Sequence, residues 1–529
     1  MKQLYFLTAA LYLITFSSPA QQFSWIGEFP MRYNMNPGMP ISQITALPNG
    51  NTVGFRVDSS AVIYGSDIYG LQLLECRDGS GTLLWELPFG PEAHLRHVIS
   101  DGNGNCVLNG YFMDTLLLGV NDTLYNTLGG LWTNIFLASI DPNGQVNWKR
   151  NLTRENPDAY EVGCLARHPD GSVWYAHSDF STSVICRLDV NGNEQRVDSV
   201  SGIRILSGLA FDPFGNRYLS GANESGTLTV NNLSISAITS YGQFVARVRA
   251  DGTAHWAYSG NDITFQRPEV VAGDDGSVSL SCAVFDSITW GNISLPSPGN
   301  AQTFYLVHAD STGFFTWGRQ MPVGADPFSY LQPLAQHYLS RLSDGTIVLI
   351  GNQRATVDWG NGVVLSSGSS FSQSTAILYF HPADGSVIHG LIGGSTGYDF
   401  TQSLAVGPAN EVWFTSTVTD SATYGPFLVN TGEAYRSIFG KVSAPLPSGM
   451  SGIAASDAVL FPNPTDDLLW VRGQAPGTSA RMFSADGRLL ERRQADEGAV
   501  FSLHQYPAGV YLLQLINETG VRCLKVIRN

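Results

Sequence analysis

A strand–turn–strand pattern recurs seven times between residues 41 and 442, and it constrains the fold more than any other feature of this chain. Each copy has two short runs of apolar, β-branched or aromatic residues around a tight-turn sequence such as Asp-Gly or Asn-Gly. These turn residues supply the positive φ that a two-stranded hairpin needs. The copies cover residues 44–55, 98–110, 165–176, 209–221, 270–281, 342–351 and 404–416.

A second strand–turn–strand follows most copies, and its last strand often carries a tryptophan. These segments are 73–85, 136–148, 244–256, 305–317 and 378–389, with a weaker copy without tryptophan at 185–194. Two hairpins per unit make a four-stranded antiparallel sheet, and the units recur at roughly 45 to 70 residues, close to the spacing of propeller blades. The pattern predicts an all-β chain with a seven-bladed β-propeller over residues 21–442. A β-helix and a tandem array of sandwiches are the alternatives.

Variation in length falls mostly between the two halves of a unit. Three units carry an extra predicted hairpin there, at residues 226–236, 288–297 and 357–366. The recurring tryptophans are Trp85, Trp148, Trp256 and Trp317. A carbohydrate site could use such rings, but a position that repeats from unit to unit favours a packing role.

The seventh unit lacks a fourth strand of its own. Residues 437–442 run directly into a Pro-rich segment, whereas residues 23–29 near the chain start belong to no unit and carry Trp25. An open ring would leave two sheet edges with unpaired backbone groups. We therefore predict that residues 23–29 pair antiparallel with residues 437–442 and close the propeller.

The two ends of the chain have their own character. Residues 1–20 are predicted to be a signal peptide, with Lys2, an apolar stretch from Leu4 to Phe16, and Ala20 before the expected cleavage site. The apolar run is too short for a membrane anchor. Residues 443–458 are rich in Pro, Gly and Ser and predict a linker. Residues 459–529 alternate short strands and turns, which predicts a small β-sandwich.

The middle of the chain resembles the SBBP-type bacterial β-propeller repeat. The resemblance is carried by GTLTVNNLSISAITSYGQFVARVRADGTAHW at 226–256 and FLASIDPNGQVNW at 136–148, and it extends over roughly 400 residues. That repeat is defined by structure and not by one reaction, so the resemblance implies a propeller and no particular catalysis.

The C-terminal segment resembles the type A sorting domain of Bacteroidetes type IX secretion. Four motifs occur in order: FPNP at 461–464, ADGRLL at 485–490, YPAGVYLL at 506–513 and LKVIRN at 524–529. The resemblance assigns the sorting signature to Pro462, Asn463, Pro464, Gly487, Gly509, Tyr511 and Lys525. It implies passage through the periplasm, recognition by the type IX machinery, and a secreted or outer-membrane surface location.

Charge and cysteine content narrow the partners. The formal net charge is −15 and no basic stripe occurs, which argues against nucleic acid as a ligand. No stretch after residue 20 is long and apolar enough to predict a transmembrane segment. The six cysteines have no metal-ligand spacing; Cys164 and Cys186 could pair, although buried free thiols are the favoured interpretation.

No motif for a catalytic, cofactor or metal site emerges. Gly393 to Gly397 matches GxSxG around Ser395, but no helix pattern follows, as a nucleophile elbow would need. His94 and His97 are expected to precede a strand, and Asp101 is expected to serve its turn. The favoured function is therefore binding of a protein or glycan outside the cell. A secreted polysaccharide hydrolase or lyase is the alternative, and an adhesin or structural role is the third.

Overall fold

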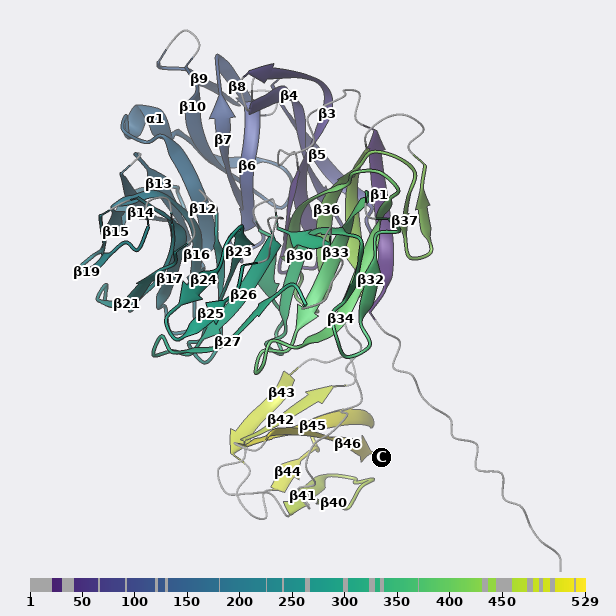
Figure 1. Ribbon diagram of the computed structural model, residues 1–529. Coiled ribbons are helices and arrows are strands. Elements are labelled where there is room, and N and C mark those ends of the chain that lie inside the picture. Colours follow the sequence, from purple (N-terminus) through teal and green to yellow (C-terminus); the bar gives the residue numbers. More distant parts are fainter. Residues whose placement is uncertain are drawn as a thin grey trace, which may run out of the picture. The chain divides into compact units, whose positions relative to one another are not determined.

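The computed structural model describes residues 21–30, 42–64, 67–90, 93–118, 122–128, 132–179, 181–224, 226–239, 242–261, 267–297, 303–322, 329–333, 337–369, 371–430, 436–443, 459–472, 479–484, 489–494, 500–517 and 520–529. The predicted signal peptide, Gly487 and nearly all of the predicted linker lie outside these residues. Gln21–Ala444 forms one compact unit, and Pro445–Asn529 belongs to a second. Both are built almost entirely of antiparallel strands (Figure 1), so the all-β prediction is confirmed.

Within its described residues, the first unit has seven sheets with four main strands each. In chain order, the first sheet contains β2 (Gln43–Ala46), β3 (Thr52–Tyr64), β4 (Asp67–Arg77) and β5 (Leu83–Phe89), and the second contains β6 (Ala93–Ser100), β7 (Cys106–Phe112), β10 (Asn134–Ile140) and β11 (Val146–Asn151). The third sheet contains β12 (Glu161–Arg167), β13 (Val173–Ser178), β14 (Thr182–Leu188) and β15 (Glu194–Ser201), and the fourth contains β16 (Ile203–Phe211), β17 (Arg217–Asn223), β20 (Gln243–Val248) and β21 (Ala254–Ser259). One short helix, α1 (Leu152–Glu155), follows β11.

The remaining three sheets follow the same plan. They are β22 (Glu269–Ala272), β23 (Val278–Val284), β26 (Thr303–Ala309) and β27 (Phe315–Gln320); β29 (Leu339–Arg341), β30 (Ile347–Arg354), β33 (Gln373–Phe380) and β34 (Val387–Ser395), with β28 (Tyr330–Gln332) also on β30; and β35 (Phe400–Val406), β36 (Val412–Val418), β39 (Arg436–Val442) and β1 (Phe23–Pro30). All seven strand–turn–strand units of the sequence are thus real hairpins.

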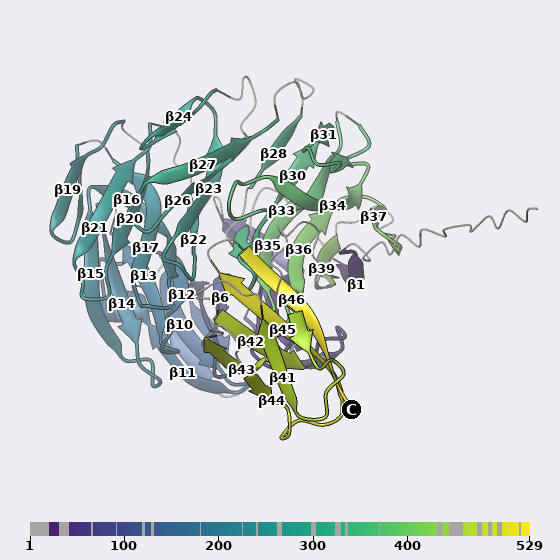
Figure 2. The same ribbon diagram turned by 90° about the horizontal axis from the view of Figure 1, so that it is seen from below.

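The first strand of each sheet is its inner strand and the fourth its outer strand. The inner strands contact one another in order, from β2 through β6, β12, β16, β22 and β29 to β35, and β35 contacts β2. Figure 2 shows the sheets following one another around the unit. Buried apolar side chains fill the spaces between successive sheets. The arrangement is propeller-like, as the repeat predicts.

The predicted pairing of the N-terminal strand is confirmed. β1 pairs antiparallel with β39, and Phe23 lies opposite Val442 while Phe29 lies opposite Ser437. Ser443 continues the contact, because its N–H donates to the Gln22 carbonyl at 2.9 Å. The outer strand of the seventh sheet therefore comes from the opposite end of the chain.

All seven ladders between third and fourth strands contain a β-bulge, and in six of them the bulge lies opposite the last two residues of the third strand. The residue just beyond the bulge is Trp25, Trp85, Trp148, Trp256, Trp317 or His389. The bulge turns this side chain toward the next sheet. β1 carries the same bulge and the same tryptophan, although it comes from the other end of the chain.

Each of these tryptophans lies against a glycine in the last turn of the next sheet. A Cβ added at Gly81 would lie 2.1 Å from the Trp25 ring, and one at Gly144 would lie 2.9 Å from the Trp85 ring. Both glycines have positive φ, so the turn and the ring contact require the same residue. The packing role predicted for the repeated tryptophans is confirmed, and the contact joins neighbouring sheets.

All three predicted extra hairpins are present: β18–β19 (Thr227–Val230, Leu233–Ser236), β24–β25 (Ile288–Trp290, Ile293–Leu295) and β31–β32 (Thr356–Asp358, Val364–Ser366). Two more were not predicted, β8–β9 (Thr115–Leu118, Asp122–Tyr125) and β37–β38 (Ala422–Tyr424, Phe427–Val429). β8, β18 and β37 pair with β5, β15 and β34, the outer strands of the preceding sheets. These hairpins cover sheet edges that would otherwise be open.

The second unit has two sheets around one core. One contains β40 (Val459–Phe461), β41 (Leu468–Arg472) and β44 (Val500–Ser502); the other contains β43 (Leu489–Gln494), β42 (Ser479–Ser484), β45 (Gly509–Asn517) and β46 (Gly520–Arg528). Leu469 and Phe501 from the first sheet share buried packing with Met482 and Leu513 from the second. This is the layered all-β arrangement that the alternating pattern predicts.

Candidate functional site

Two histidines from distant parts of the chain meet among the inner strands. His97 lies on β6, and His337 lies two residues before β29, yet Nδ1 of His97 is 3.4 Å from Nε2 of His337. Nε2 of His97 is 3.3 Å from the carbonyl oxygen of Val162, which can only accept a hydrogen bond. His97 therefore carries its proton on Nε2, and its Nδ1 accepts from the N–H of His337.

Ionisable groups surround this pair. Glu269 accepts the backbone N–H groups of His337, Tyr338 and Leu339. Nη2 of Arg267 donates to Oε1 of Glu161 at 2.6 Å. The cluster thus joins β6, β12, β22 and the segment before β29, and both of its carboxylates already have partners.

Burial sets the protonation of the cluster. Burial, the facing His337, and the guanidinium groups of Arg96 and Arg267 hold the pKa of His97 well below its usual value. Burial alone lowers the pKa of His337 to about 4. Burial raises the pKa of Glu269 to about 8, against the opposing effect of its three backbone hydrogen bonds. Both imidazoles are therefore neutral at pH 7 and serve as hydrogen-bonding groups.

The sequence did not indicate this cluster, and one expectation about it is wrong. His94 and His97 do not precede a strand; both lie within β6. The pairing of β6 with β7 continues past the predicted hairpin to Ala93 and Phe112, across a bulge between Leu95 and His97. A one-residue bulge leaves no local sequence signal, and the contact with His337 spans 240 residues.

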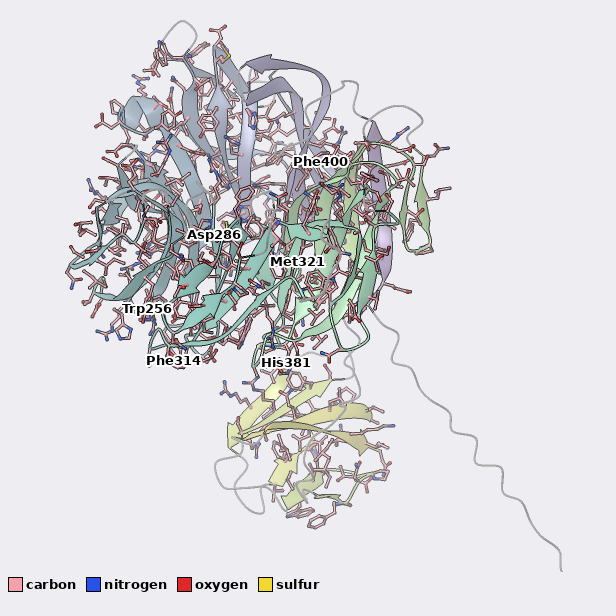
Figure 3. The ribbon with its side chains drawn as sticks, viewed as in Figure 1. Trp256, Asp286, Phe314, Met321, His381 and Phe400 are labelled. Carbon is pink, nitrogen blue, oxygen red and sulfur yellow. The ribbon has the colours of Figure 1, made fainter. Side chains whose placement is uncertain are left out.

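We expect the His97–His337 pair to make the protein acid-sensitive. Because the pKa of each is lower in the folded than in the unfolded state, the stability they contribute is present above pH 6.5 and lost as pH falls through about 4. His337→Gln should reduce this loss by roughly 3 kcal/mol between pH 6.5 and 4, measured by urea unfolding. His381→Gln, at an exposed turn (Figure 3), is the matched control. An unchanged pH profile for His337→Gln would contradict the assignment.

Glu269 has the opposite effect on how stability depends on pH. Its pKa is raised in the folded state, so the stability that it contributes is present below pH 4.5 and lost as pH rises through about 8. Glu269→Gln keeps one of the two acceptor oxygens and removes the ionisation, so it should flatten the alkaline side of the same profile.

A polar groove lies between the second and third sheets, at the turns. Its volume is about 540 Å³, and Trp148 lines it together with Asn103, Asp170, Arg187 and Asp189. A second groove, of about 510 Å³, lies between the fifth and sixth sheets and is more apolar, with Met321 (Figure 3) and Trp359 in its wall. These are concave surfaces of the size that small ligands use.

Exposed aromatic side chains gather at one end of the strands, in the connections that leave from that end. Of the eight exposed aromatics among the described residues, six lie where second strands connect to third strands, or where one sheet connects to the next: Tyr125, Trp132, Tyr160, Phe285, Phe371 and Tyr398. Phe214 and Phe314 lie at the opposite end. In an antiparallel four-stranded sheet both of these connections leave from the same end of the strands. That end therefore offers most of the exposed aromatic surface.

The weak chemical motifs have structural explanations. Ser395 ends β34, its Oγ donates to Oδ1 of Asp399 at 2.6 Å, and strand β35 follows in place of a helix. Oδ1 of Asp101 accepts the N–H groups of Asn103 and Asn105, which is a turn role. The described residues contain no group of three or more His, Cys, Asp and Glu that could hold a metal ion.

Five cysteines are buried free thiols: Cys76, Cys106, Cys164, Cys186 and Cys282. The favoured interpretation is confirmed for these five, and Cys164 does not pair with Cys186. Burial raises the pKa of the Cys76 thiol to about 11 and that of Cys186 to about 12. Thiols in this state are poor nucleophiles, so they serve as core residues.

The structure brings some of the predicted sorting residues together. Nδ2 of Asn463 donates to the Lys525 carbonyl at 2.6 Å, and the Ile527 N–H donates to Oδ1 of Asn463 at 2.8 Å. The Pro462–Pro464 motif is therefore joined to the last strand through Asn463. Tyr511 packs in the core of the same unit, its hydroxyl donating to the Pro507 carbonyl, and Gly509 begins β45.

The described part of the chain is thus an all-β protein with a propeller-like first unit and a layered second unit. No helix in that part has the length and apolar character needed to cross a bilayer. No family model matches the chain, and no curated protein matches it.

Solved structures with some likeness include three of different kinds. A protein of unknown function from Dyadobacter fermentans is 10% identical over 80% of this chain and 100% of that chain, with a TM-score of 0.35. PorZ, a surface component of the type-IX secretion system of Porphyromonas gingivalis, is 9% identical over 96% and 99%, with a TM-score of 0.17. The exotype rhamnogalacturonan lyase YesX is 12% identical over 78% and 75%, with a TM-score of 0.32.

Proposed function

We propose that this chain is a secreted or cell-surface seven-bladed β-propeller, exported by type IX secretion, that binds a protein or glycan outside the cell. The single observation that carries the binding role is the rigid array of sheets with concave grooves between their turns. Binding sites commonly lie on the loops of such scaffolds.

Ring closure is the first part of the proposal. The succession of inner strands that returns from β35 to β2 supports seven blades in one ring. Trp25 of the last sheet against Gly81 of the first repeats the contact that joins neighbouring sheets elsewhere. Lys441 adds a hydrogen bond from Nζ to the Gly79 carbonyl at 2.6 Å.

Export is the second part. The FPNP, YPAGVYLL and LKVIRN motifs support a sorting role for the C-terminal unit, in which Asn463 ties the first motif to the last. The resemblance assigns the signature to Pro462, Asn463, Pro464, Gly487, Gly509, Tyr511 and Lys525. Its partner would be the type IX machinery.

Truncation tests the export part. In a Bacteroidetes host, a chain without residues 459–529 should fold but remain in the periplasm, because the signal that the machinery recognises is gone. Surface protease accessibility and cell fractionation measure this. Arg492→Ala, at an exposed position outside the signature, should be exported normally. Surface display of the truncated chain would defeat the sorting assignment.

A hydrolase or lyase is the second candidate, and the His97–His337–Glu269 cluster is the observation that favours it. Histidine beside a carboxylate with perturbed pKa values is typical of catalytic sites. However, the carboxylate of Glu269 is occupied by three backbone N–H groups, and His97 is only 2% exposed. We therefore favour binding. Polysaccharide cleavage that is lost in Glu269→Gln with unchanged stability would reverse this preference.

A further inference from the structure

The tryptophan of the second sheet, Trp148, lacks a hydrogen bond that two of its counterparts make; the Trp256 indole N–H lacks it as well, but that group is buried. Nε1 of Trp85 donates to the Pro142 carbonyl at 2.7 Å, and Nε1 of Trp317 donates to the Pro382 carbonyl at 2.9 Å. Each bond joins the outer strand to the last turn of the next sheet. Val190 takes the corresponding turn position after Trp148, and the Trp148 indole N–H has no hydrogen-bond partner among the described residues.

Trp148 also keeps part of its ring accessible. Trp256 and Trp317 are each only 7% exposed, whereas Trp148, like Trp25 and Trp85, is half-buried, and of these five tryptophans Trp148 is the one that lines the 540 Å³ groove. Its ring still lies against Gly192, where an added Cβ would be 2.4 Å away. The ring is therefore held in a fixed position while its N–H remains available. A fixed aromatic ring beside a free donor is a suitable surface for the CH groups and hydroxyls of a sugar.

Flat polar groups surround the ring. Nη2 of Arg187 and Oδ2 of Asp170 form an exposed pair at 2.9 Å, and Asn193 donates to Asp189 at 2.8 Å. Asn103 reaches across from the second sheet to within 3.8 Å of the Cβ position at Gly171 in the third. The side chains of Asn103 and Gln195 have no hydrogen-bond partner among the described residues. Paired amide, carboxylate and guanidinium groups suit neighbouring hydroxyls, because they donate and accept together.

The charge of the groove selects among glycans. Asp101, Asp170, Asp189 and Glu194 line it with a single guanidinium, that of Arg187. Such a surface repels uronic acids and sulfated sugars, since like charges oppose binding. We propose that the groove between the second and third sheets binds an uncharged oligosaccharide, with Trp148 as the stacking platform. This proposal rests on the proposed binding function and names a glycan, not a protein, as the ligand. It does not depend on the proposed route of export.

Calorimetry on the mature chain tests the site. The probes are cellohexaose, xylohexaose, mannohexaose, chitohexaose and maltohexaose, with hexagalacturonate as the charged comparison. At least one neutral probe should bind with a Kd below about 1 mM. Trp148→Phe keeps a ring against Gly192 but removes the N–H, and should weaken binding about tenfold. Asn103→Ala and Gln195→Ala should each weaken it several-fold.

Asn143→Ala is the matched control, because Asn143 holds a comparable exposed turn position but does not line the groove. Its affinity should equal that of the unaltered chain, and thermal unfolding should confirm that all four variants are folded. The proposal is overturned if no neutral probe binds at about 5 mM. It is also overturned if Trp148→Phe and Asn103→Ala bind as well as the unaltered chain, or if hexagalacturonate binds more tightly than every neutral probe. Loss of surface export would leave these results unchanged, so the two proposals fail separately.

Discussion

A mature chain that lacks residues 21–30 is expected not to fold its first unit. Without β1, the backbone of β39 becomes an open edge from Arg436 to Val442. Phe23, only 3% exposed, would leave a core in which it meets the Tyr424 ring edge-on at 5.4 Å. Phe29 would no longer contact the guanidinium groups of Arg56 and Arg77, which lie 4.6 and 4.7 Å from the centre of its ring.

The size of this effect follows from the aromatic side chains involved. Burial of Phe23 contributes about 1.5–3 kcal/mol, and the half-buried Trp25 and Phe29 contribute about half as much each. Their sum reaches the lower end of the free energy of unfolding of a typical protein, about 5–15 kcal/mol. Soluble yield and urea unfolding followed by circular dichroism measure the outcome.

Point variants distinguish the loss of packing by β1 from the effect of shortening the chain. Phe23→Ala should cost about 3–5 kcal/mol, as large-to-small changes in a core do. Ser24→Ala, at the exposed neighbouring position, should change stability little. If the truncated chain unfolds with the same midpoint as the complete one, then β1 is dispensable and ring closure has another origin.

The second large effect is expected at the contact between the third and fourth sheets. β15 is the one outer strand without a Trp or His beyond an aligned bulge, and a buried ion pair lies there instead. Nε of Arg217 is 2.6 Å from Oδ2 of Asp198, and both side chains are almost fully buried. Nδ2 of Asn231, in the left-handed turn of β18–β19, donates to Oδ1 of Asp198 at 2.7 Å.

Asp198→Ala should destabilise the protein by about 3–5 kcal/mol, because it leaves the Arg217 charge buried without its partner. Burial already lowers the pKa of Arg217 and raises that of Asp198, which shows how strongly this site disfavours charge. Urea unfolding at pH 7 measures the cost. Arg187→Ala, which breaks an exposed pair with Asp170, should cost at most about 1 kcal/mol.

A double variant tests the mechanism. Asp198→Leu combined with Arg217→Met removes both charges and should cost clearly less than Asp198→Ala alone. Equal costs for the single and double variants would mean that packing, and not the unpaired charge, governs this contact.

Most of the strand order could be predicted from the sequence, because it depends on local signals. Turns such as Asp141 to Gly144 are determined by their own residues, because Oδ1 of Asp141 accepts two backbone N–H groups and Gly144 supplies the positive φ. Even the long-range pairing of residues 23–29 with 437–442 could be predicted, since an unmatched strand and an unmatched edge were both visible. The β8–β9 and β37–β38 hairpins were missed because their strands have only 4 and 3 residues, too few to show a clear alternation.

The candidate sites depended on the tertiary structure. Trp148 belongs to the same repeated pattern as Trp85 and Trp317, and only the next sheet decides whether its N–H is bonded or free. His97 and His337 had no pattern at all, because their contact exists only where inner strands from different sheets converge. By itself the sequence determined the repeating hairpins and the strand that completes the last sheet, since turn chemistry and alternation act over a few residues. The polar clusters and grooves were decided by how the sheets meet, because burial and partner choice arise only when distant segments pack together.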